Sequence, residues 1–341
     1  MAVLHLLGSS ADGGAETYFA DLTRALHGAG VPAAAAIRAH NVREQALTEA
    51  GVPTRVFGFG GPLDWRTRRR VADFARQQEA RVLLAWMNRA ARHCPAGPWA
   101  RLGRLGGYYD LKNYAGFDGL IANTARIRDW IIDQGWPVER VHHIPNFAEP
   151  EPGLPLDRAA FTTPERAFLL LSMGRLHASK AHDVSLRALT RLPEVWLWIA
   201  GAGPLDAELR RLAADLGVAE RVRFLGWRED AAALYRTADA VLFPSRFEPL
   251  GNVVLQAWAQ GVPIAAAASD GPAALIRDGD DGLLFPVDDV DAAATAARRL
   301  LHDQPLRFAL IERGRRRVRE GFSREAVVAQ WRPLLTLYGS R

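Results

Sequence analysis

The sequence alternates between short apolar runs and longer segments with helical periodicity over most of its length. Apolar runs such as AVLHLLG near the start and FLLLSMG at 168–174 are each followed by a helical pattern. Because these runs are apolar at nearly every position, we expect strands that are buried on both faces. Such strands, alternating with helices, form doubly wound parallel sheets, so the predicted class is α/β.

A proline-rich polar stretch interrupts this alternation between residues 149 and 166, with four prolines and little apolar content. Such a stretch indicates a linker or a domain boundary. The length of 341 residues also exceeds the usual size of one compact core. We therefore predict an N-terminal Rossmann-like domain at 1–150, a linker at 151–166, a C-terminal Rossmann-like domain at 167–322, and a final helix at 323–341 that crosses back to the first domain.

The composition is that of a globular protein in a reducing compartment. Hydrophobic residues make up 49% and charged residues 24% of the chain, which excludes a largely disordered protein. The single cysteine, Cys94, excludes an intrachain disulfide and a cysteine-cluster zinc site. No apolar run approaches the length that spans a bilayer, and the opening AVLHLLG is typical of a first strand rather than a signal peptide. We expect a cytoplasmic protein.

The net charge of +5 includes two basic runs, RTRRR at 66–70 and RGRRRVR at 313–319. Both lie in helical patterns, so they suit contact with an anionic membrane surface or with the phosphates of a lipid-linked acceptor. Solvated helix faces are the alternative, and the more common one for such runs. A peripheral position at the inner face of the membrane stays open. Nucleic-acid binding is disfavoured, because no recognised binding motif accompanies the basic runs.

Only two of the 43 basic residues are lysines, Lys112 and Lys180. A chain that otherwise uses arginine can keep a lysine where a compact ammonium is needed instead of a planar fork. Lys180 ends the loop 174–180, GRLHASK, in which Gly174 closes a predicted strand and Arg175 follows it. Arg175 and Lys180 could together hold a diphosphate without a metal. A salt-bridged loop is the alternative.

Three glycine turns also follow predicted strands, and each either approaches a ligand or simply turns the chain. The first contains Gly13 and Gly14 before a helix whose N-terminal N–H groups could bind an anion. The second contains Gly203, in GAGPL. The third is FLGW at 224–227, where Leu225 and Gly226 could read a base through backbone groups. Core packing of its two aromatic rings is the alternative.

The stretch RFEPLGNVVLQAWAQG at 246–261 places one carboxylate before a bend and a helix. Glu248 could accept hydrogen bonds from vicinal hydroxyls of a sugar. Leu250, Gly251 and Asn252 lie at the predicted helix N-terminus, where backbone N–H groups could face a ligand. Gln256 lies further along the helix and could reach another polar group of the same ligand.

Taken together, these motifs resemble the retaining family-four glycosyltransferases, which have the GT-B fold of two Rossmann-like domains facing across a cleft. The resemblance covers nearly the whole chain. It is carried by GGAE at 13–16, IPN at 144–146, GRL-x3-K, GAGPL, FLGW, ADAVLFPS with EPLG, and QAWAQGVPIAA.

The resemblance implies a nucleotide-sugar donor, UDP- or GDP-linked, as a substrate, with no cofactor and no metal. It assigns Arg175 and Lys180 to the diphosphate, and Glu248 with the amides of Leu250, Gly251 and Asn252 to the donor sugar. The turn at 224–227 would bind the base. The second domain then binds the donor and the first domain lies on the acceptor side.

Two positions depart from the family pattern. The family places a second glutamate on the ribose hydroxyls where this chain has Gln256, and a neutral amide forms weaker hydrogen bonds there than a carboxylate. Many members also have a histidine in the first domain near the donor sugar, but the corresponding segment RLGRLGGYYDLKNY has none. Arg104, Tyr108 and Lys112 are the acceptor-side candidates. His93 is close in sequence, although a position in a surface loop is equally consistent with the pattern.

The predicted function is therefore a hexosyl-type, retaining, metal-independent glycosyltransferase. It would move a sugar from the donor to a glycan or lipid-linked acceptor, in lipopolysaccharide or other surface-polysaccharide biosynthesis. The family mechanism is front-face transfer without a protein nucleophile, and the sequence contains no recognisable catalytic triad, metal-ligand cluster or Walker motif. A non-catalytic nucleotide-sugar-binding protein, and a sugar-nucleotide epimerase or hydrolase with the same fold, are the alternatives.

Overall fold

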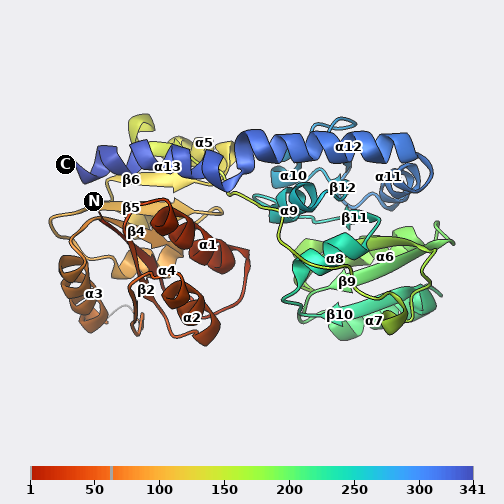
Figure 1. Ribbon diagram of the computed structural model, residues 1–341, viewed down its shortest axis with the longest axis horizontal. Helices are drawn as coiled ribbons and strands as arrows, with labels where there is room; N and C mark the ends of the chain where they lie inside the picture. The colour runs from red at the N-terminus through yellow and green to blue at the C-terminus, as the bar shows by residue number, and fades with distance from the viewer. Residues whose placement is uncertain (1, 62–63, 341) are drawn as a thin grey trace. The chain divides into compact units, whose positions relative to one another are not determined.

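The computed structural model describes residues 2–61 and 64–340 and divides the chain into two compact units (Figure 1). The first unit contains the residues up to Asn146 together with those from Arg324 onward. The second contains Phe147–Ser323. Each unit is built around one parallel sheet with helices on both faces, which confirms the predicted α/β class.

The sheet of the first unit has the strand order β3-β2-β1-β4-β5-β6-β7. The chain starts at the centre with β1, moves out to one edge at β3, returns to β4 and continues to the other edge, which is the doubly wound arrangement. Every pair is parallel. The strands are β1 (Ala2–Leu7), β2 (Ala33–Ile37), β3 (Thr54–Val56), β4 (Ala80–Trp86), β5 (Ala100–Leu105), β6 (Gly119–Ala122) and β7 (Val141–His143).

Side-chain caps fix where several helices of this unit begin. The carboxylate of Asp64 accepts a hydrogen bond from the backbone N–H of Thr67 at 3.0 Å, and Thr124 caps α5 in the same way. The helices are α1 (Gly14–Gly28), α2 (Asn41–Glu49), α3 (Trp65–Gln77), α4 (Met87–His93), α5 (Ala125–Asp133) and α13 (Arg324–Gly339), with short 3₁₀ turns η1 (Leu111–Tyr114) and η2 (Val138–Arg140).

Helix α13 at the end of the chain belongs to the first unit. It packs against α1 and β4, and its Trp331 and Tyr338 are buried there. The hydroxyl of Tyr338 lies 2.9 Å from Nε2 of His142 in β7, at the far edge of the sheet. The last helix therefore completes the core of a unit whose sheet is formed by the first 143 residues.

The second unit repeats the same winding with the strand order β10-β9-β8-β11-β12-β13. Its strands are β8 (Phe168–Met173), β9 (Val195–Ala200), β10 (Val222–Gly226), β11 (Ala240–Phe243), β12 (Ile264–Ala267) and β13 (Leu283–Phe285). Its α-helices are α6 (His182–Leu189), α7 (Asp206–Asp215), α8 (Ala231–Thr237), α9 (Asn252–Gln260), α10 (Asp270–Leu275), α11 (Val290–His302) and α12 (Gln304–Arg317). The 3₁₀ turns η3 (Ala159–Phe161), η4 (Ala178–Lys180) and η5 (Ala219–Arg221) and the π-helix η6 (Val318–Phe322) complete it.

Alternate residues of β8 supply two separate cores in the second unit. Leu170 packs into the cluster covered by α6, α7 and α11, whereas Leu169 and Leu171 pack into the cluster covered by α8 and α9. Successive side chains of a strand point to opposite faces, so a run that is apolar at every position fits a sheet covered on both sides.

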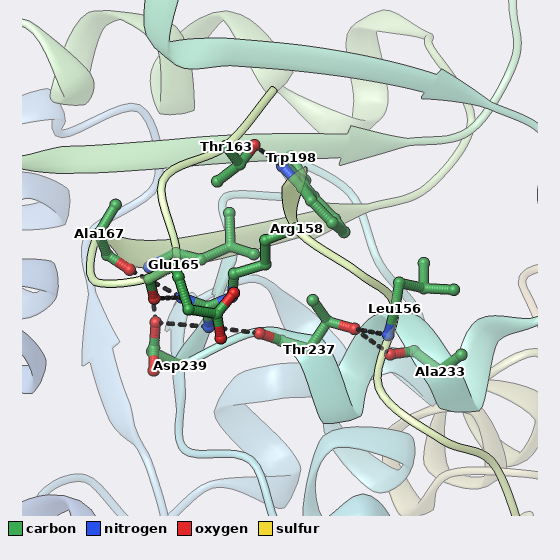
Figure 2. Close-up of polar contacts among 10 residues, drawn as sticks. Leu156, Arg158, Thr163, Glu165, Ala167, Trp198, Ala233, Thr237 and Asp239 are labelled. Carbon is green, nitrogen blue, oxygen red and sulfur yellow. Dashed lines mark hydrogen bonds and ion pairs between the residues drawn. The ribbon is translucent and has the colours of Figure 1, made fainter. Parts of the chain in front are cut away.

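The segment predicted as a linker, 151–166, lies within the second unit and is bound along its surface (Figure 2). The backbone N–H of Leu156 donates to the hydroxyl of Thr237 at 2.7 Å. The guanidinium of Arg158 donates to the carbonyl oxygens of Ala167 and Thr237, at 2.8 and 2.6 Å, and to the carboxylate of Asp239 at 3.0 Å. Prolines lack a backbone donor, so side chains and the remaining amides make these attachments.

We predict that Arg158→Lys lowers the free energy of unfolding by about 1–2 kcal/mol, because an ammonium cannot reach all four acceptors around the planar fork, the fourth being the carbonyl oxygen of Glu165. Urea unfolding measures this. Arg166→Lys is the matched control, since Arg166 is exposed on the same segment. Equal stability of the two variants would show that the Arg158 contacts do not hold the segment.

Candidate functional site

Two glycine turns of the second unit pack backbone against backbone at the carboxyl ends of β8 and β9. A Cβ atom on Gly201 would overlap the carbonyl oxygen of Gly174, and one on Gly203 would overlap the carbonyl oxygen of Leu176. Gly174 and Gly201 also have φ angles of 146° and 154°, which L side chains rarely adopt. The GAGPL turn thus sets the path of the loop that leads to Lys180.

A buried histidine forms hydrogen bonds to the start of this loop and to the strand before it. His182, the first residue of α6, places Nε2 3.2 Å from the carbonyl oxygen of Gly174 and Nδ1 3.1 Å from the hydroxyl of Ser172. A carbonyl only accepts, so Nε2 carries the proton and Nδ1 accepts from Ser172. Burial lowers the pKa of His182 to about 4, which keeps the ring neutral in this role.

Lys180 and Glu248 form a direct ion pair between Nζ and Oε2. Lys180 ends η4, and Glu248 lies in the loop between β11 and α9. Their side chains are 24% and 14% exposed, so the pair is largely shielded from water but still reachable. An ammonium has three donors, and its contact with Glu248 leaves others for a second anion. The two residues predicted to act on the donor are brought together.

Arg246 ties the two loops that carry this pair. Its guanidinium donates two hydrogen bonds to the carboxylate of Asp183 on α6, at 2.9 and 2.7 Å, and also contacts Asp288. Its backbone N–H donates to the carbonyl oxygen of Ser179 at 2.9 Å. A planar fork suits this bidentate arrangement. Arg246 therefore holds Glu248 in reach of Lys180.

The N-terminus of α9 lies immediately after Glu248. Gly251 has a φ angle of 87° and turns the chain into the helix. Its backbone N–H donates to Oε1 of Glu248 at 3.2 Å, so this predicted sugar-binding amide is engaged by the carboxylate itself. Leu250 is buried and Asn252 is half-buried at the first helical position.

Gln256 is exposed on α9 and its orientation is fixed by a tyrosine. The hydroxyl of Tyr235, buried on α8, donates to Oε1 of Gln256 at 3.1 Å. Burial raises the pKa of Tyr235, so the phenol keeps its proton. The amide NH₂ of Gln256, a donor, is then the group turned away from Tyr235.

The turn after β10 exposes one of its aromatic rings. Trp227 is 58% exposed, so the core-packing alternative is wrong for this residue. Phe224 packs against the core, with the guanidinium of Arg210 4.6 Å from its ring centroid, and Leu225 is also partly buried. Gly226 has a φ angle of 68°, and its carbonyl oxygen accepts from the N–H of Gly201 at 2.8 Å. The turn at 224–227, which the sequence predicts to bind a base, is thereby attached to the GAGPL turn.

In the first unit the glycine turn after β1 is braced by side chains. Arg43 on α2 donates to the carbonyl oxygens of Ser9 and Ala11, at 3.1 and 2.8 Å. Gly13 caps α1 and Gly14 is its first residue, while Glu16 accepts from the hydroxyl of Ser9 at 2.7 Å. The turn is therefore fixed by its own neighbours at the carboxyl edge of the sheet.

Arg104 is buried and bonded inside the first unit. Its guanidinium donates to the carbonyl oxygen of Ile144 at 2.6 Å and to the side-chain oxygen of Asn146 at 2.8 Å, and lies 5.5 Å from the ring centroid of Trp331 on α13. Burial lowers its pKa to about 10. These contacts explain the IPN motif: its backbone and amide oxygens accept hydrogen bonds from a buried cation at the end of β5 and so replace the water that the cation loses.

The other first-unit candidates are dispersed. Tyr108 is half-buried, with its ring edge-on to Trp130 at 5.2 Å. Lys112 is 81% exposed and pairs with Asp110 at 2.9 Å. His93 is not a surface loop residue: it is buried at the end of α4, with Nδ1 2.9 Å from the carbonyl oxygen of Arg89 and its ring edge against Phe59.

Three residues of the site escaped the sequence analysis: Arg246, His182 and Tyr235. Arg246 lies two positions before Glu248, and His182 two positions after Lys180, so proximity to these residues was a usable signal. Tyr235 had none, because its contact with Gln256 joins two neighbouring helices whose packing the sequence does not show.

Within residues 2–61 and 64–340, no group of three His, Cys, Asp or Glu side chains is placed to hold a metal ion. No helix in this part of the chain is long and apolar enough to cross a membrane.

Comparison with known proteins identifies relatives along the whole chain. The family model described as glycosyl transferases group 1 matches residues 155–317. The lipopolysaccharide core biosynthesis glycosyltransferase LpsE of Rhizobium meliloti is 35% identical over 337 residues, which cover 95% of this chain and 96% of that protein. LpsD of the same organism is 34% identical, with 96% of each chain covered.

Solved structures share the fold at lower identity. A crystal structure of Anabaena Alr3699/HepE in complex with UDP matches with a TM-score of 0.86 and 20% identity, over 99% of this chain and 100% of that chain. The lipopolysaccharide outer core galactosyltransferase WaaB matches with a TM-score of 0.73 and 16% identity, over 99% of both chains. Likeness at these identities establishes the fold, which is GT-B.

The depressed pKa of His182 predicts a specific pH dependence of stability. The folded ring titrates near pH 4 and the unfolded ring near 6.5, so its contribution is complete above pH 6.5 and is lost as the pH falls towards 4. Between pH 7 and 5 this group should account for about 2 kcal/mol of lost stability. Glutamine does not titrate, so the free energy of unfolding of His182→Gln, measured in urea, should fall by about 2 kcal/mol less than that of the wild type between pH 7 and 5. An identical fall in both proteins would contradict the assignment.

Proposed function

Because the chain belongs to the group 1 glycosyltransferases, we propose that it moves a sugar from a nucleotide-sugar donor, UDP- or GDP-linked, to a glycan or lipid-linked acceptor in lipopolysaccharide or other surface-polysaccharide assembly. The LpsE and LpsD relatives, matched over almost their full length, support this setting. The solved complexes of HepE with UDP and with UDP-glucose support the donor class. The observation that carries the proposal is the Lys180–Glu248 pair beside the N-terminus of α9.

Each donor group is proposed to have a partner in the second unit. Lys180 binds the diphosphate with the ammonium hydrogens that Glu248 does not use, and the exposed Arg175 adds a planar fork from the same loop. Glu248 binds sugar hydroxyls, supported by the amides at residues 250–252. The turn at 224–227 binds the base, and the amide of Gln256 binds the ribose.

The proposed transfer is retaining and independent of a metal. The bond between the anomeric carbon and the diphosphate oxygen breaks, and the acceptor oxygen bonds to that carbon on the same face. The acceptor proton passes to a phosphate oxygen. Lys180 and Arg175 stabilise the charge that develops on the leaving diphosphate, which is where electrostatic catalysis acts most strongly.

The role of the first unit is proposed from the family pattern and from exposure. Lys112 and Tyr108 are the candidates for acceptor contact, because Lys112 is exposed and Tyr108 is half-buried. Arg104 acts as a positioning residue, since its guanidinium bonds to Ile144 and Asn146. The basic run at 313–319, in α12 and the turn that follows it, is proposed to bring the protein to the anionic inner face of the membrane.

We predict that one nucleotide, UDP or GDP, and its sugar conjugates raise the melting temperature, and that EDTA does not change the effect. Lys180→Ala should abolish the shift and reduce kcat on the matching donor by about 100-fold or more. Arg187→Ala, an exposed arginine on α6, is the control and should behave as wild type.

The outcomes of this panel separate the candidate functions. An unchanged response of Lys180→Ala would overturn the diphosphate assignment. Donor binding without turnover on any glycan acceptor would favour a non-catalytic nucleotide-sugar-binding protein. Release of free sugar, or conversion of one sugar nucleotide into another without an acceptor, would favour a hydrolase or an epimerase. NMR of the anomeric proton of the product tests retention.

We predict that Gln256→Glu tightens donor binding by about three- to tenfold, because one carboxylate oxygen can still accept from Tyr235 while the other forms charge-assisted bonds to ribose hydroxyls. Isothermal titration calorimetry with the nucleoside diphosphate measures the change. Gln256→Ala is the comparison and should weaken binding. Weaker binding in Gln256→Glu would mean that position 256 does not face the ribose.

A further inference from the structure

A surface cavity of about 540 Å³ lies in the first unit and has no part in the proposed transfer. It runs along α3 and is bordered by the turn that follows α4 and by the start of β5. Its volume is within the range of small-molecule sites. Two of its lining residues, Arg68 and Arg69, belong to the basic run RTRRR at 66–70.

The lining of this cavity is strongly basic. Arg68, Arg69, Arg76 and Arg101 line it, opposed by the single carboxylate of Asp73. Asp73 accepts a hydrogen bond from Arg76 at 2.8 Å, so one of the four cations is partly neutralised. A surplus of positive charge therefore surrounds a volume large enough for a charged ligand group.

The walls of the cavity are fixed by hydrogen bonds to backbone oxygens. Nε of Arg68 donates to the carbonyl oxygen of Arg92 at 2.9 Å, which joins α3 to the end of α4. Arg101 donates to the carbonyl oxygen of Gly116, and its guanidinium lies 5.3 Å from the ring centroid of Phe117. Each guanidinium uses part of its five donors in this way, so its plane is oriented before a ligand arrives.

Cys94 lines the same cavity, and the pKa of its thiol depends on the charges of nearby side chains. Burial raises the pKa of its thiol to about 12, the charges of Arg101 and Arg68 lower it, and the charge of Asp118 raises it. Two of the four arginines are therefore near enough to one buried lining atom to influence its ionisation.

The cavity is separate from the glycine turn of the first unit. Arg76 is in the last turn of α3, just before β4 begins, and Arg101 is at the start of β5. Both lie at the amino edge of the parallel sheet. Gly13 and Gly14 follow the end of β1 and lie at the carboxyl edge. A ligand at the arginines is thus distinct from one bound at the turn.

We propose that this cavity binds a phosphate group of a ligand other than the nucleotide-sugar donor. Guanidinium forks match the oxygens of a phosphate in pairs, and several of them around one volume are typical of phosphate recognition. The phosphate is borne either by a phosphorylated glycan or by a phospholipid headgroup, which share this chemistry. The site does not depend on the proposed donor chemistry.

The test compares two double variants of the full-length chain that remove the same charge from the same helix. Arg69→Gln with Arg76→Gln removes two lining residues. Arg66→Gln with Arg70→Gln is the control, because Arg66 lies over the ring of Trp65 and Arg70 over that of Phe57, and neither lines the cavity. Any phosphate bound at Lys180 is common to both variants.

Isothermal titration calorimetry with glycerol 1-phosphate at low salt gives the first readout. We expect binding about tenfold weaker in the cavity variant and within about twofold of wild type in the control. Equal weakening in the two variants would show a diffuse basic surface and overturn the proposal. Binding that is unchanged in the cavity variant would also overturn it.

Co-sedimentation with vesicles then assigns the source of the phosphate. The vesicles contain equal parts of phosphatidic acid and phosphatidylcholine, with pure phosphatidylcholine as the reference. Loss of vesicle binding in the cavity variant alone identifies a lipid headgroup. Equal vesicle binding by all three proteins, together with the calorimetric difference, identifies a phosphorylated glycan. Both results support the site.

Discussion

The candidate site depends on the close packing of two backbone turns in the second unit. Gly174 and Gly201 meet so closely that a single Cβ atom would push the turns apart. The loop that begins at Gly174 ends at Lys180, and Lys180 pairs with Glu248. A loop between a strand and a helix can adopt many conformations. The contact between Gly174 and Gly201 fixes one conformation of the loop 174–180, and in that conformation Lys180 reaches Glu248.

Arginine and lysine have different tasks in this chain. Arg158 and Arg246 each join separate segments of the second unit, and Arg104 does so in the first, with guanidinium forks that reach several acceptors. The ammonium group of Lys180 has one direct contact with a carboxylate, which leaves other N–H donors for a ligand. A chain that fixes its loops with arginine can leave its ammonium free to change partners when a ligand binds.

The fold was largely predictable from the sequence, because strands buried on both faces leave a continuous apolar signal that polar helices interrupt. The pairing of Lys180 with Glu248 was predictable only through the family pattern, since 68 residues separate them. Local patterns could not reveal that Tyr235 orients Gln256, or that Arg104 is buried against α13. The first depends on how two neighbouring helices pack against each other, and the second on how the last helix packs on the sheet of the first unit. The sequence also could not show that the segment 151–166 is bound to the second unit. Its hydrogen bonds use the same polar residues that made the segment resemble a free linker.

The return of α13 to the first unit has a consequence for biosynthesis. Protein domains generally fold in the order in which they are made. Here the residues of the second unit are synthesised completely before the helix that carries Trp331 and Tyr338 exists. Until then the apolar surface that α13 covers on the first unit stays open, and the cation of Arg104 lacks one of its aromatic neighbours. The first unit therefore begins to be synthesised first but completes its fold last.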